Sequence, residues 1–534
     1  MIYRRKKLGR RLVAGAMMTA MSMPIAGAAF ADDIIDNFRM GGYLRTWASF
    51  NLNDIPDTPE NDRGDLSMLR ASLLVDTDFS TGPVGWKMIF RADREYKTDY
   101  VKRLENLTRN KFGGAFAGGP GSDVMEQYDQ TELREFYADF DVGGRTKLRL
   151  GKQQVVWGET DFFRAMDVVH GYDMRWRSFL EPENEELRKP LILANATIQV
   201  PEAQGALQII LRPGWDRKRD IGNSYDMYGG RWTPQTFTGA DFLAGGMTMA
   251  YDYNHPDGDE NDVTGGIRWK AQAGPITYSL AYLKTFNPDP IVNSAFAPYM
   301  KAPSNPFGDW IYPEIDLVGV TASGFVEPID SILSTEIVLF MDAPYNVGLD
   351  VPGSKFSTCP GGCPLGSPNT LPGFGGVIKK DTLLTMFRVD KPLNLRSMLN
   401  TSSDSFLSFQ VFDKWILDYK KSDEIVDLAG YNAARDEHTT VITGILAMNF
   451  KSDTINPTLA VGVDPWNAGG FVIPSVDVVL GDNWRLRVEA DLFFSKDKRT
   501  PSAASVNGLS EGDTRLFGYF NNRDQLLFRV TRQF

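Results

Sequence analysis

Apolar and polar residues alternate with a period of two in segments spread along the whole chain, and this pattern constrains the fold more than any other feature. In the stretch 484–494, Trp484, Leu486 and Val488 share one face, whereas Arg485 and Arg487 share the other. A period of two is typical of a β-strand with one apolar face. Many of these segments run for about 10–14 residues, the length of a tilted strand that crosses a membrane. The pattern therefore favours membrane strands over the short strands of a soluble sandwich.

The connections between these segments alternate between short turns and long polar stretches. Eight hairpins can be counted, and a first strand near 38–52 and a last strand at 525–534 bring the total to eighteen. Pairing of these two end strands would close a cylinder without free sheet edges. We therefore predict an all-β fold, a single transmembrane antiparallel β-barrel of about 18 strands (16–20) with long outer loops and short periplasmic turns.

The predicted strands are 38–52, 67–79, 84–96, 129–142, 146–157, 191–200, 205–212, 263–272, 276–286, 314–326, 331–342, 381–390, 404–417, 438–450, 457–463, 472–480, 484–496 and 525–534. The segment 243–253 also alternates but is left over. Either it extends a hairpin above the membrane, or the count changes by two.

The N-terminus has the features of a secretory signal peptide. Basic residues at 4–11 precede a short apolar run, which ends in the small-x-small sequence Ala29-Phe30-Ala31. We expect cleavage before Asp32, which divides the chain into a signal peptide, 1–31, and a barrel, 32–534. An uncleaved membrane anchor is the alternative.

The C-terminus points to the outer membrane of a Gram-negative cell. The last segment alternates and ends on Phe534, which resembles the sorting signal of outer-membrane barrels. Arg532 departs from that signal, because an aromatic residue is usual at the third position from the end. An edge strand of a soluble sheet remains the alternative.

Composition excludes some classes of protein. The mean hydropathy is −0.27, and no apolar run after the signal approaches the roughly 18 residues of a spanning helix. The formal net charge is −11, and removal of the six basic residues in 1–31 makes it −17. An acidic chain is a poor partner for nucleic acid, whose phosphates attract clustered positive charge.

The chain shows no convincing catalytic or metal motif, so we expect no enzyme, no metal and no cofactor. None of the three histidines lies in a metal-ligand pair. The sequence His438-Thr439-Thr440 is the nearest approach to the His and Ser of outer-membrane phospholipases, which leaves a hydrolase as a weaker alternative. The acidic stretch 255–262 starts like a calcium loop but departs from it at Asp262 and Arg268.

Cys359 and Cys363 lie in the sequence CPGGC. In an exported protein we interpret them as a small disulfide at a loop tip. A two-ligand metal site is the alternative, but no histidine lies nearby.

The stretch GKQQVVWGETDFFRAMDVVHGYD, 151–173, passes from strand alternation into a run of charges. By the strand count it leads into the third outer loop, 158–190, which folds inward in general porins. We therefore expect a loop that enters the barrel and charges that stand in the channel. Asp167, His170 and Asp173 could hold a proton relay, but we expect them to line solvent. The predicted pore constriction comprises Glu159, Asp161, Arg164, Asp167, His170 and Asp173.

The polar faces of the strands predict the lining of the lumen. Charges of both signs there could link across the wall and orient a polar solute. The predicted lining residues are Arg70, Asp76, Arg91, Asp93, Glu135, Asp139, Arg149, Arg485, Arg487, Glu489 and Asp491.

Several stretches resemble one protein family. They are LRLGKQQVVWGETD (148–161), MDVVHGYD (166–173), ELRKPLILANATIQ (186–199), GGIRWKAQAGPITYSLAYLKTF (265–286) and STEIVLFMDAPYN (334–346). The chain is similar over 38–534 to an uncharacterised group of Gram-negative outer-membrane proteins known as domain of unknown function 1302. The most specific part is Gln153-x-Val155-x-Trp157-Gly158-Glu159, whereas His170 departs from the Asn- or Ser-type residue we expect there.

The resemblance implies a barrel whose genes often lie near an RND-type exporter and a companion periplasmic protein. It implies traffic of small organic or hydrophobic molecules and supplies no catalytic residues. We expect a porin-like channel, and a loop-closed barrel that receives a lipid-like ligand from a periplasmic shuttle is the alternative. Expected partners are outer-membrane lipids, lipopolysaccharide, the barrel assembly machinery and the RND-type transporter with its companion, with a homotrimer as an option.

Overall fold

The fold is seen in a computed structural model. It describes residues 35–54, 60–111, 125, 128–158, 160, 163–181, 183–225, 251–304, 308–348, 355–356, 373–426, 434–466, 469–495, 517, 520 and 523–534. The predicted signal peptide, most of the leftover segment 243–253, both cysteines, Glu159 and Asp161 lie outside these residues.

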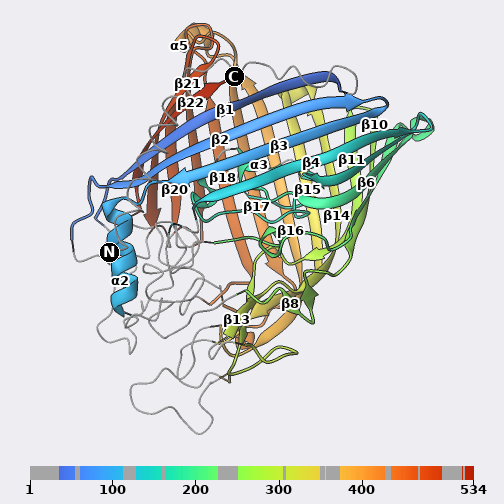
Figure 1. Cartoon of the computed structure of the whole chain (residues 1–534), viewed down its shortest axis with the longest axis vertical. Coiled ribbons are helices and arrows are strands. Elements are labelled where there is room, and N and C mark those ends of the chain that lie inside the picture. The colour runs from blue at the N-terminus through green and yellow to red at the C-terminus, as the bar shows by residue number, and fades with distance from the viewer. Residues whose placement is uncertain are drawn as a thin grey trace, which may run out of the picture.

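Eighteen strands form one closed antiparallel sheet, as predicted (Figure 1). The cylinder closes where β1 pairs with β22, from Tyr43 opposite Gln533 to Asn51 opposite Gln525. The strands of the wall are β1 Asp36–Asn51, β2 Leu66–Thr81, β3 Val84–Glu95, β4 Gln130–Val142, β5 Thr146–Gln153, β6 Leu191–Val200, β7 Gly205–Arg212, β10 Thr264–Ala273, β11 Ile276–Phe286, β14 Glu314–Val326, β15 Ser331–Asn346, β16 Val377–Leu393, β17 Ser405–Ile416, β18 His438–Ala447, β19 Ile455–Asp464, β20 Gly469–Leu480, β21 Trp484–Ser495 and β22 Gln525–Gln533.

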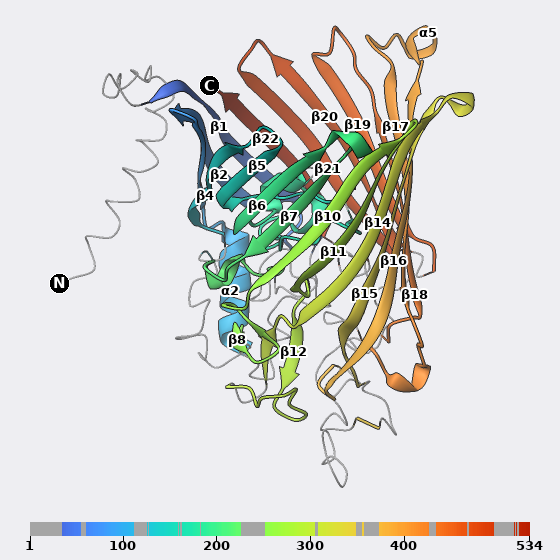
Figure 2. The same cartoon turned by 90° about the vertical axis from the view of Figure 1, so that its right-hand side faces the viewer.

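The two ends of the barrel differ. At one end, strands are joined by short connections such as 143–145 and 481–483, the longest of which contains α5 (Arg396–Leu399). At the other end lie the long connections, which carry α2 (Asp99–Lys111), β8 (Asn254–His255), β9 (Gly258–Asp259), β12 (Ile291–Ser294) and β13 (Gly308–Ile311). Figure 2 shows α5 at the top, and α2, β8 and β12 at the bottom. We call these the short-turn end and the long-loop end.

The outer surface of the wall is apolar. Leu280, Val320 and Phe387 are exposed by 50%, 45% and 46%, and each lies on the face of its strand that points away from the lumen. A water-soluble protein rarely exposes a continuous belt of such side chains. The belt is the lipid-facing surface of a barrel that spans a membrane. Among the described helices, none has both the length and the apolar character that a bilayer crossing demands.

Strand β5 is shorter than predicted, because it ends at Gln153 instead of 157. Gly151 takes a φ of 128°, where a Cβ would lie 2.3 Å from the carbonyl oxygen of Phe136. The Gln153 amide then donates to the carbonyl of Leu193 on β6 at 3.0 Å. Beyond this point Val155 and Trp157 are buried inside the barrel. The alternation of Val155 and Trp157 therefore does not mark a strand of the wall, because the chain has already entered the interior of the barrel.

A bulge in β4 places two neighbouring charges on the lumen side. Ile89 is opposite Glu135 and Phe90 is opposite Leu133, so that Arg134 is the extra residue. Leu133 and Phe136, on either side, are exposed to the outside. A bulge of this kind turns a side chain that strict alternation would send outward.

Candidate functional site

The chain between β5 and β6, residues 154–190, is called the inner segment, and its described residues 154–158, 160, 163–181 and 183–190 cross the lumen. Its Trp157 indole donates to Gln208 on β7 at 3.0 Å, and the Met166 amide donates to Glu336 on β15 at 2.8 Å. Its Arg177 pairs with Glu489 on β21. These three strands lie in different parts of the wall, and α3 (Asn184–Leu187) of the segment lies within the ring of strands in Figure 1.

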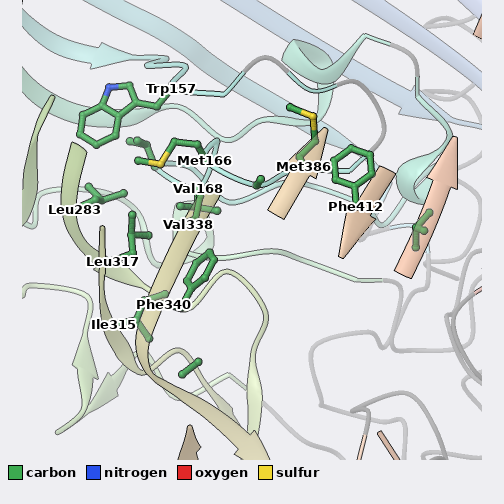
Figure 3. Packing of buried hydrophobic residues seen from close by; sticks show 14 of the residues in the cluster. Trp157, Met166, Val168, Leu283, Ile315, Leu317, Val338, Phe340, Met386 and Phe412 are labelled. Atoms are coloured by element: carbon green, nitrogen blue, oxygen red, sulfur yellow. The ribbon is translucent and has the colours of Figure 1, made fainter. Parts of the chain in front are cut away.

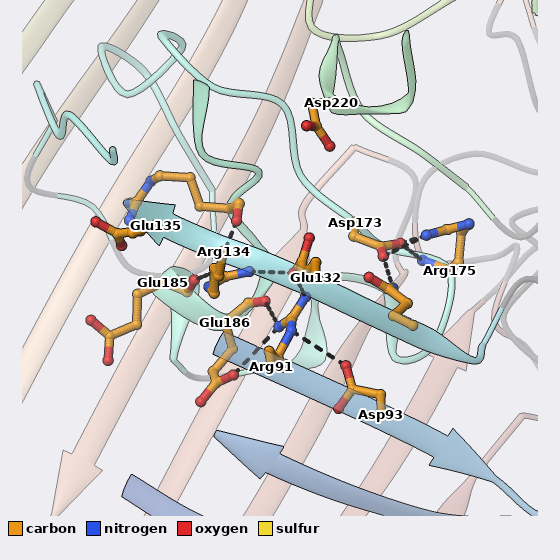
Figure 4. A network of polar contacts seen from close by, with 12 residues as sticks. Arg91, Asp93, Glu132, Arg134, Glu135, Asp173, Arg175, Glu185, Glu186 and Asp220 are labelled. Atoms are coloured by element: carbon orange, nitrogen blue, oxygen red, sulfur yellow. Dashed lines mark hydrogen bonds and ion pairs between the residues drawn. The ribbon is translucent and has the colours of Figure 1, made fainter. Parts of the chain in front are cut away.

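Charged residues fasten one side of the inner segment to β1, β3 and β4. Arg91 lies 2.9 Å from Glu132 and 3.6 Å from Glu186 of the segment, and it also donates to the Glu186 carbonyl at 2.7 Å (Figure 4). Arg45 pairs with Glu183 and Glu186, each at 3.3 Å. Apart from Glu183, these side chains are largely out of water, where an ion pair needs close geometry to offset its desolvation.

Arg177 is the most deeply placed charge of the inner segment. Its side chain is fully buried and bonds to Glu489, with Glu181 at 3.1 Å and Asp491 at 3.7 Å. The guanidinium carbon lies 5.2 Å from the ring centre of Trp47 on β1. One cation therefore ties the segment to two carboxylates on β21 and to the wall beside the closing strands.

The opposite side of the inner segment packs on an apolar part of the wall. Met166 and Val168 lie among Leu317, Val338 and Leu283 (Figure 3). Gly319 on β14 allows this approach, since a Cβ there would lie 2.3 Å from the Met166 sulfur. The buried apolar residues that β11 and β14–β21 supply to this cluster are Leu283, Ile315, Leu317, Val338, Phe340, Ala343, Tyr345, Met386, Phe412, Ile416, Val441, Ala460, Phe471, Ile473 and Phe493.

His170 holds the inner segment together from within. Its Nε2 accepts the Val155 amide at 2.8 Å, and its Nδ1 lies 3.0 Å from the Lys189 carbonyl, to which it donates. Burial lowers the pKa of His170 to about 3, so the ring is neutral. A neutral ring with a proton on Nδ1 satisfies both contacts.

Asp167 and Asp173 are also buried, which corrects the expectation that they and His170 line solvent. Asp167 accepts from Tyr172 at 2.7 Å and pairs with Arg188 at 2.6 Å. Burial raises the pKa of Asp173, but Arg175 at 2.7 Å outweighs this effect and the net pKa is lowered. Buried carboxylates need such partners, so these residues shape the segment from inside.

Of the other predicted constriction residues, the structure describes Arg164 only. The guanidinium carbon of Arg164 stands 3.5 Å above the ring of Tyr172. Glu159 and Asp161 lie outside the described residues.

Most predicted lumen residues face inward and are paired. Arg70 lies 3.0 Å from Asp93, Asp76 lies 2.6 Å from Lys87, and Arg149 lies 2.7 Å from Asp139. Arg487 joins Asp477 at 2.8 Å to Glu489 at 2.7 Å. The inward-facing Glu135 accepts from Gln154 of the segment at 2.8 Å. Arg485 differs, because it is only half-buried near the short-turn end and donates to the Trp484 carbonyl at 2.9 Å.

Several site residues were missed from the sequence. Lys189 donates to the carbonyls of Arg219 and Ile221 at 2.9 and 3.2 Å and to the Ser224 hydroxyl at 3.0 Å. Burial lowers the pKa of Lys189 to about 7. The wall-contacting charges Arg177, Glu181, Glu183 and Glu186 also follow Asp173, where the predicted site ended. The only signal was that the charge run continues to Arg188 and Lys189.

The histidine considered for hydrolysis lacks the required geometry. His438 Nδ1 lies 2.9 Å from Asp413, and the Thr440 hydroxyl donates to the same carboxylate at 2.7 Å. The hydroxyl therefore meets a carboxylate, whereas an activated nucleophile would donate to the ring. Within the part of the chain that the structure describes, no three His, Cys, Asp or Glu side chains gather as metal ligands would.

Comparison with known families gives one match that covers nearly the whole chain. The model described as "Protein of unknown function (DUF1302)" matches residues 26–534. The chain belongs to this family. No curated protein matches the sequence.

Among solved structures, similar folds include OccAB1 from Acinetobacter baumannii, with 10% identity, a TM-score of 0.42 and coverage of 95% of this chain and 98% of that chain. Pseudomonas aeruginosa OpdK with vanillate has 10% identity, a TM-score of 0.41 and coverage of 94% and 100%. Salmonella typhi OmpF in complex with daunomycin has 7% identity, a TM-score of 0.39 and coverage of 93% and 97%.

Proposed function

We propose that this DUF1302 protein is an outer-membrane channel for small organic or hydrophobic solutes and that the inner segment controls passage. The observation that carries the proposal is the crossing of the lumen by residues 154–190, with Arg177 bonded to Glu489 on one side and Met166 packed on Gly319 on the other. A long segment inside a compact fold is usually functional.

In this proposal the residues of the segment divide into two roles. Asp167, His170 and Asp173 maintain its shape through buried contacts. Glu159, Asp161 and Arg164 remain the candidates for contact with the solute. Cooperation with a periplasmic companion protein and an RND-type exporter is part of the proposal, because the resemblance to the family suggests it.

Planar-bilayer recording tests the proposal on the full mature chain. We expect discrete conductance steps from the wild type and a higher open probability from Glu489→Gln, which weakens the bond to Arg177. Asp413→Asn is the matched control, since Asp413 bonds to His438 and Thr440 away from the inner segment. Silence of the wild type and of Glu489→Gln alike would exclude a channel.

A closed barrel that stores a lipid-like ligand is the second candidate. The dense packing of the inner segment favours it, because both Trp157 and Arg177 are fully buried. Mass spectrometry of the purified protein distinguishes the two candidates. A stoichiometric lipid without conductance supports the closed barrel, whereas conductance without a bound lipid supports the channel.

A further inference from the structure

The inner segment is attached to the wall in two chemically different ways. Toward β1, β3, β21 and β22 the contacts are ion pairs, as between Arg45 and Glu183 or Arg177 and Glu489. Toward β14–β20 the described contacts are mainly between apolar side chains. The interior of a water-filled barrel is usually polar, so an apolar half of the lumen calls for an explanation of its own.

Phenylalanine rings form the contact on the apolar side, and we call this contact the aromatic seam. Phe163 and Phe179 belong to the inner segment, whereas Phe412 and Phe471 belong to β17 and β20. The ring centres of Phe163 and Phe412 are 5.8 Å apart, and those of Phe179 and Phe471 are 5.6 Å apart. Phe517 touches both sides, at 6.1 Å from Phe163 and 5.3 Å from Phe471.

The apolar surface continues beyond the seam in both directions along the wall. On β16, Ile378 near the long-loop end, Leu384 and the buried Met386 belong to it or pack against it. Ile378 and Met386 are eight residues apart on this strand, a distance of roughly 26 Å at about 3.3 Å per residue. Ile378, Leu384 and, nearer the short-turn end, Ile445 are only partly buried. The apolar surface is therefore accessible at both of its ends.

The two attachments should respond differently to a solute. Breaking a buried ion pair is strongly unfavourable, because the remaining charge stays out of water without its partner. Contacts between rings have no donor or acceptor to satisfy, and each contributes only modestly beyond the apolar area that it buries. A flat apolar molecule can replace one ring contact by another, while Arg177 remains bonded to β21.

We propose that the aromatic seam between Phe163 and Phe179 of the inner segment and Phe412 and Phe471 of the wall binds and conducts flat, uncharged aromatic solutes. The proposal rests on the proposed channel function and specifies its substrate class. The solute enters between the rings, and the charged side of the segment serves as the fixed edge of the opening.

The first test is uptake of N-phenyl-1-naphthylamine by intact cells that express the full chain, followed by its fluorescence. Phe179→Gln places an amide in the seam, where desolvation should lower the uptake rate roughly tenfold. Phe179→Leu keeps an apolar side chain and should retain most of the uptake. The matched control is Phe325→Gln, because Phe325 lies on the inner face of β14 near the short-turn end, exposed by 51% and outside the seam.

The outcomes separate the seam from the channel. If uptake falls in Phe179→Gln but not in Phe325→Gln, and potassium conductance is retained, the result supports conduction of aromatic solutes by the seam. If uptake is equal in Phe179→Gln and the wild type while conductance is present, the result overturns this role of the seam and leaves the proposed channel intact. Equal loss in Phe179→Gln and Phe325→Gln also overturns it. Absence of conductance from the wild type and from Glu489→Gln alike overturns the channel itself.

A second measurement needs no variant, in case Phe179→Gln does not fold. In planar bilayers, 1-naphthol should block the wild-type current in a saturable manner, whereas glucose at the same concentration should not. Equal effects of the two solutes, or no block by 1-naphthol, would overturn the seam.

Discussion

At the scale of single residues, the interior of this barrel depends on buried polar groups that are satisfied by partners far away in the sequence. Arg177 and Glu489 are 312 positions apart. Such pairs are costly to break, because the remaining partner stays out of water. Substitutions at these positions should therefore have larger effects than substitutions of lumen pairs that water can reach.

The bond between Arg177 and Glu489 provides a double-mutant test. We expect Arg177→Met to lower the free energy of unfolding by roughly 3–5 kcal/mol. Glu489→Gln should lower the free energy of unfolding less in the Arg177→Met variant than in the wild type. The difference between the two effects, the coupling energy, should be about 1 kcal/mol or more. Urea unfolding of the refolded barrel measures both values.

Arg149 and Asp139 supply the control for this cycle. Their side chains are 29% and 21% exposed, and a pair that water reaches contributes about 0–1 kcal/mol. Additive effects for Arg177 and Glu489, or an equally large coupling for Arg149 and Asp139, would contradict the role of burial.

Because His170 is buried as a neutral ring, we expect the stability of the inner segment to depend on pH. Its pKa is about 3 when folded against an ordinary value of 6.5, because burial disfavours the charged ring. Below pH 6.5 the unfolded segment binds a proton that the folded segment does not, so stability falls as the pH falls, by about 1.4 kcal/mol per unit. Between pH 6.5 and 5 the open probability in bilayers should therefore rise. His170→Asn should lose this rise in open probability, and His438→Gln should keep it. The reverse result would show that His170 is not the group whose protonation causes the rise.

At the scale of elements, the strands could be predicted well and the inner segment could not. Alternation predicts β21 because lipid on one side and lumen on the other impose a separate requirement on every second residue. Val155 and Trp157 follow the same alternation but face the interior. The positive φ of Gly151 just before them, where a Cβ would lie 2.3 Å from the Phe136 carbonyl oxygen, depends on a neighbouring strand that the local pattern does not reveal. Likewise, the burial of Asp167 depends on Tyr172 and Arg188, and nothing in a linear pattern states that they converge.

Gly171 tests how closely the inner segment meets the connection between β7 and β10. A Cβ at this position would lie 1.9 Å from the Gly222 carbonyl oxygen, a backbone atom that cannot rotate away. Gly171→Ala should therefore push the segment from its place, so that limited proteolysis cleaves within 154–190 faster than in the wild type. Gly85→Ala is the control, since its nearest contact would be an ordinary 3.8 Å to Asp139. Equal protection of both variants would show that the contact is not needed.

At the scale of the whole molecule, the barrel and its contents have separate sources of stability. The wall is closed by backbone pairing all around, including β1 with β22. The inner segment adds side-chain contacts but no strand to that wall. Its two ends also lie side by side, because Gln153 is opposite Leu191 across β5 and β6.

This geometry predicts that the inner segment can be removed without opening the barrel. Replacing residues 154–190 by a short Asn-Gly turn would join two paired strand ends, which is the arrangement of a tight hairpin. We expect a folded barrel that still shifts on heating in gel electrophoresis, because backbone pairing of the wall is untouched. Its conductance should rise several-fold, since Arg45, Arg91 and Glu489 would then face water instead of the segment. Block by 1-naphthol should disappear with Phe163 and Phe179. A replaced barrel that fails to fold would show that the segment supports the wall, and an unchanged conductance would show that the segment does not limit passage.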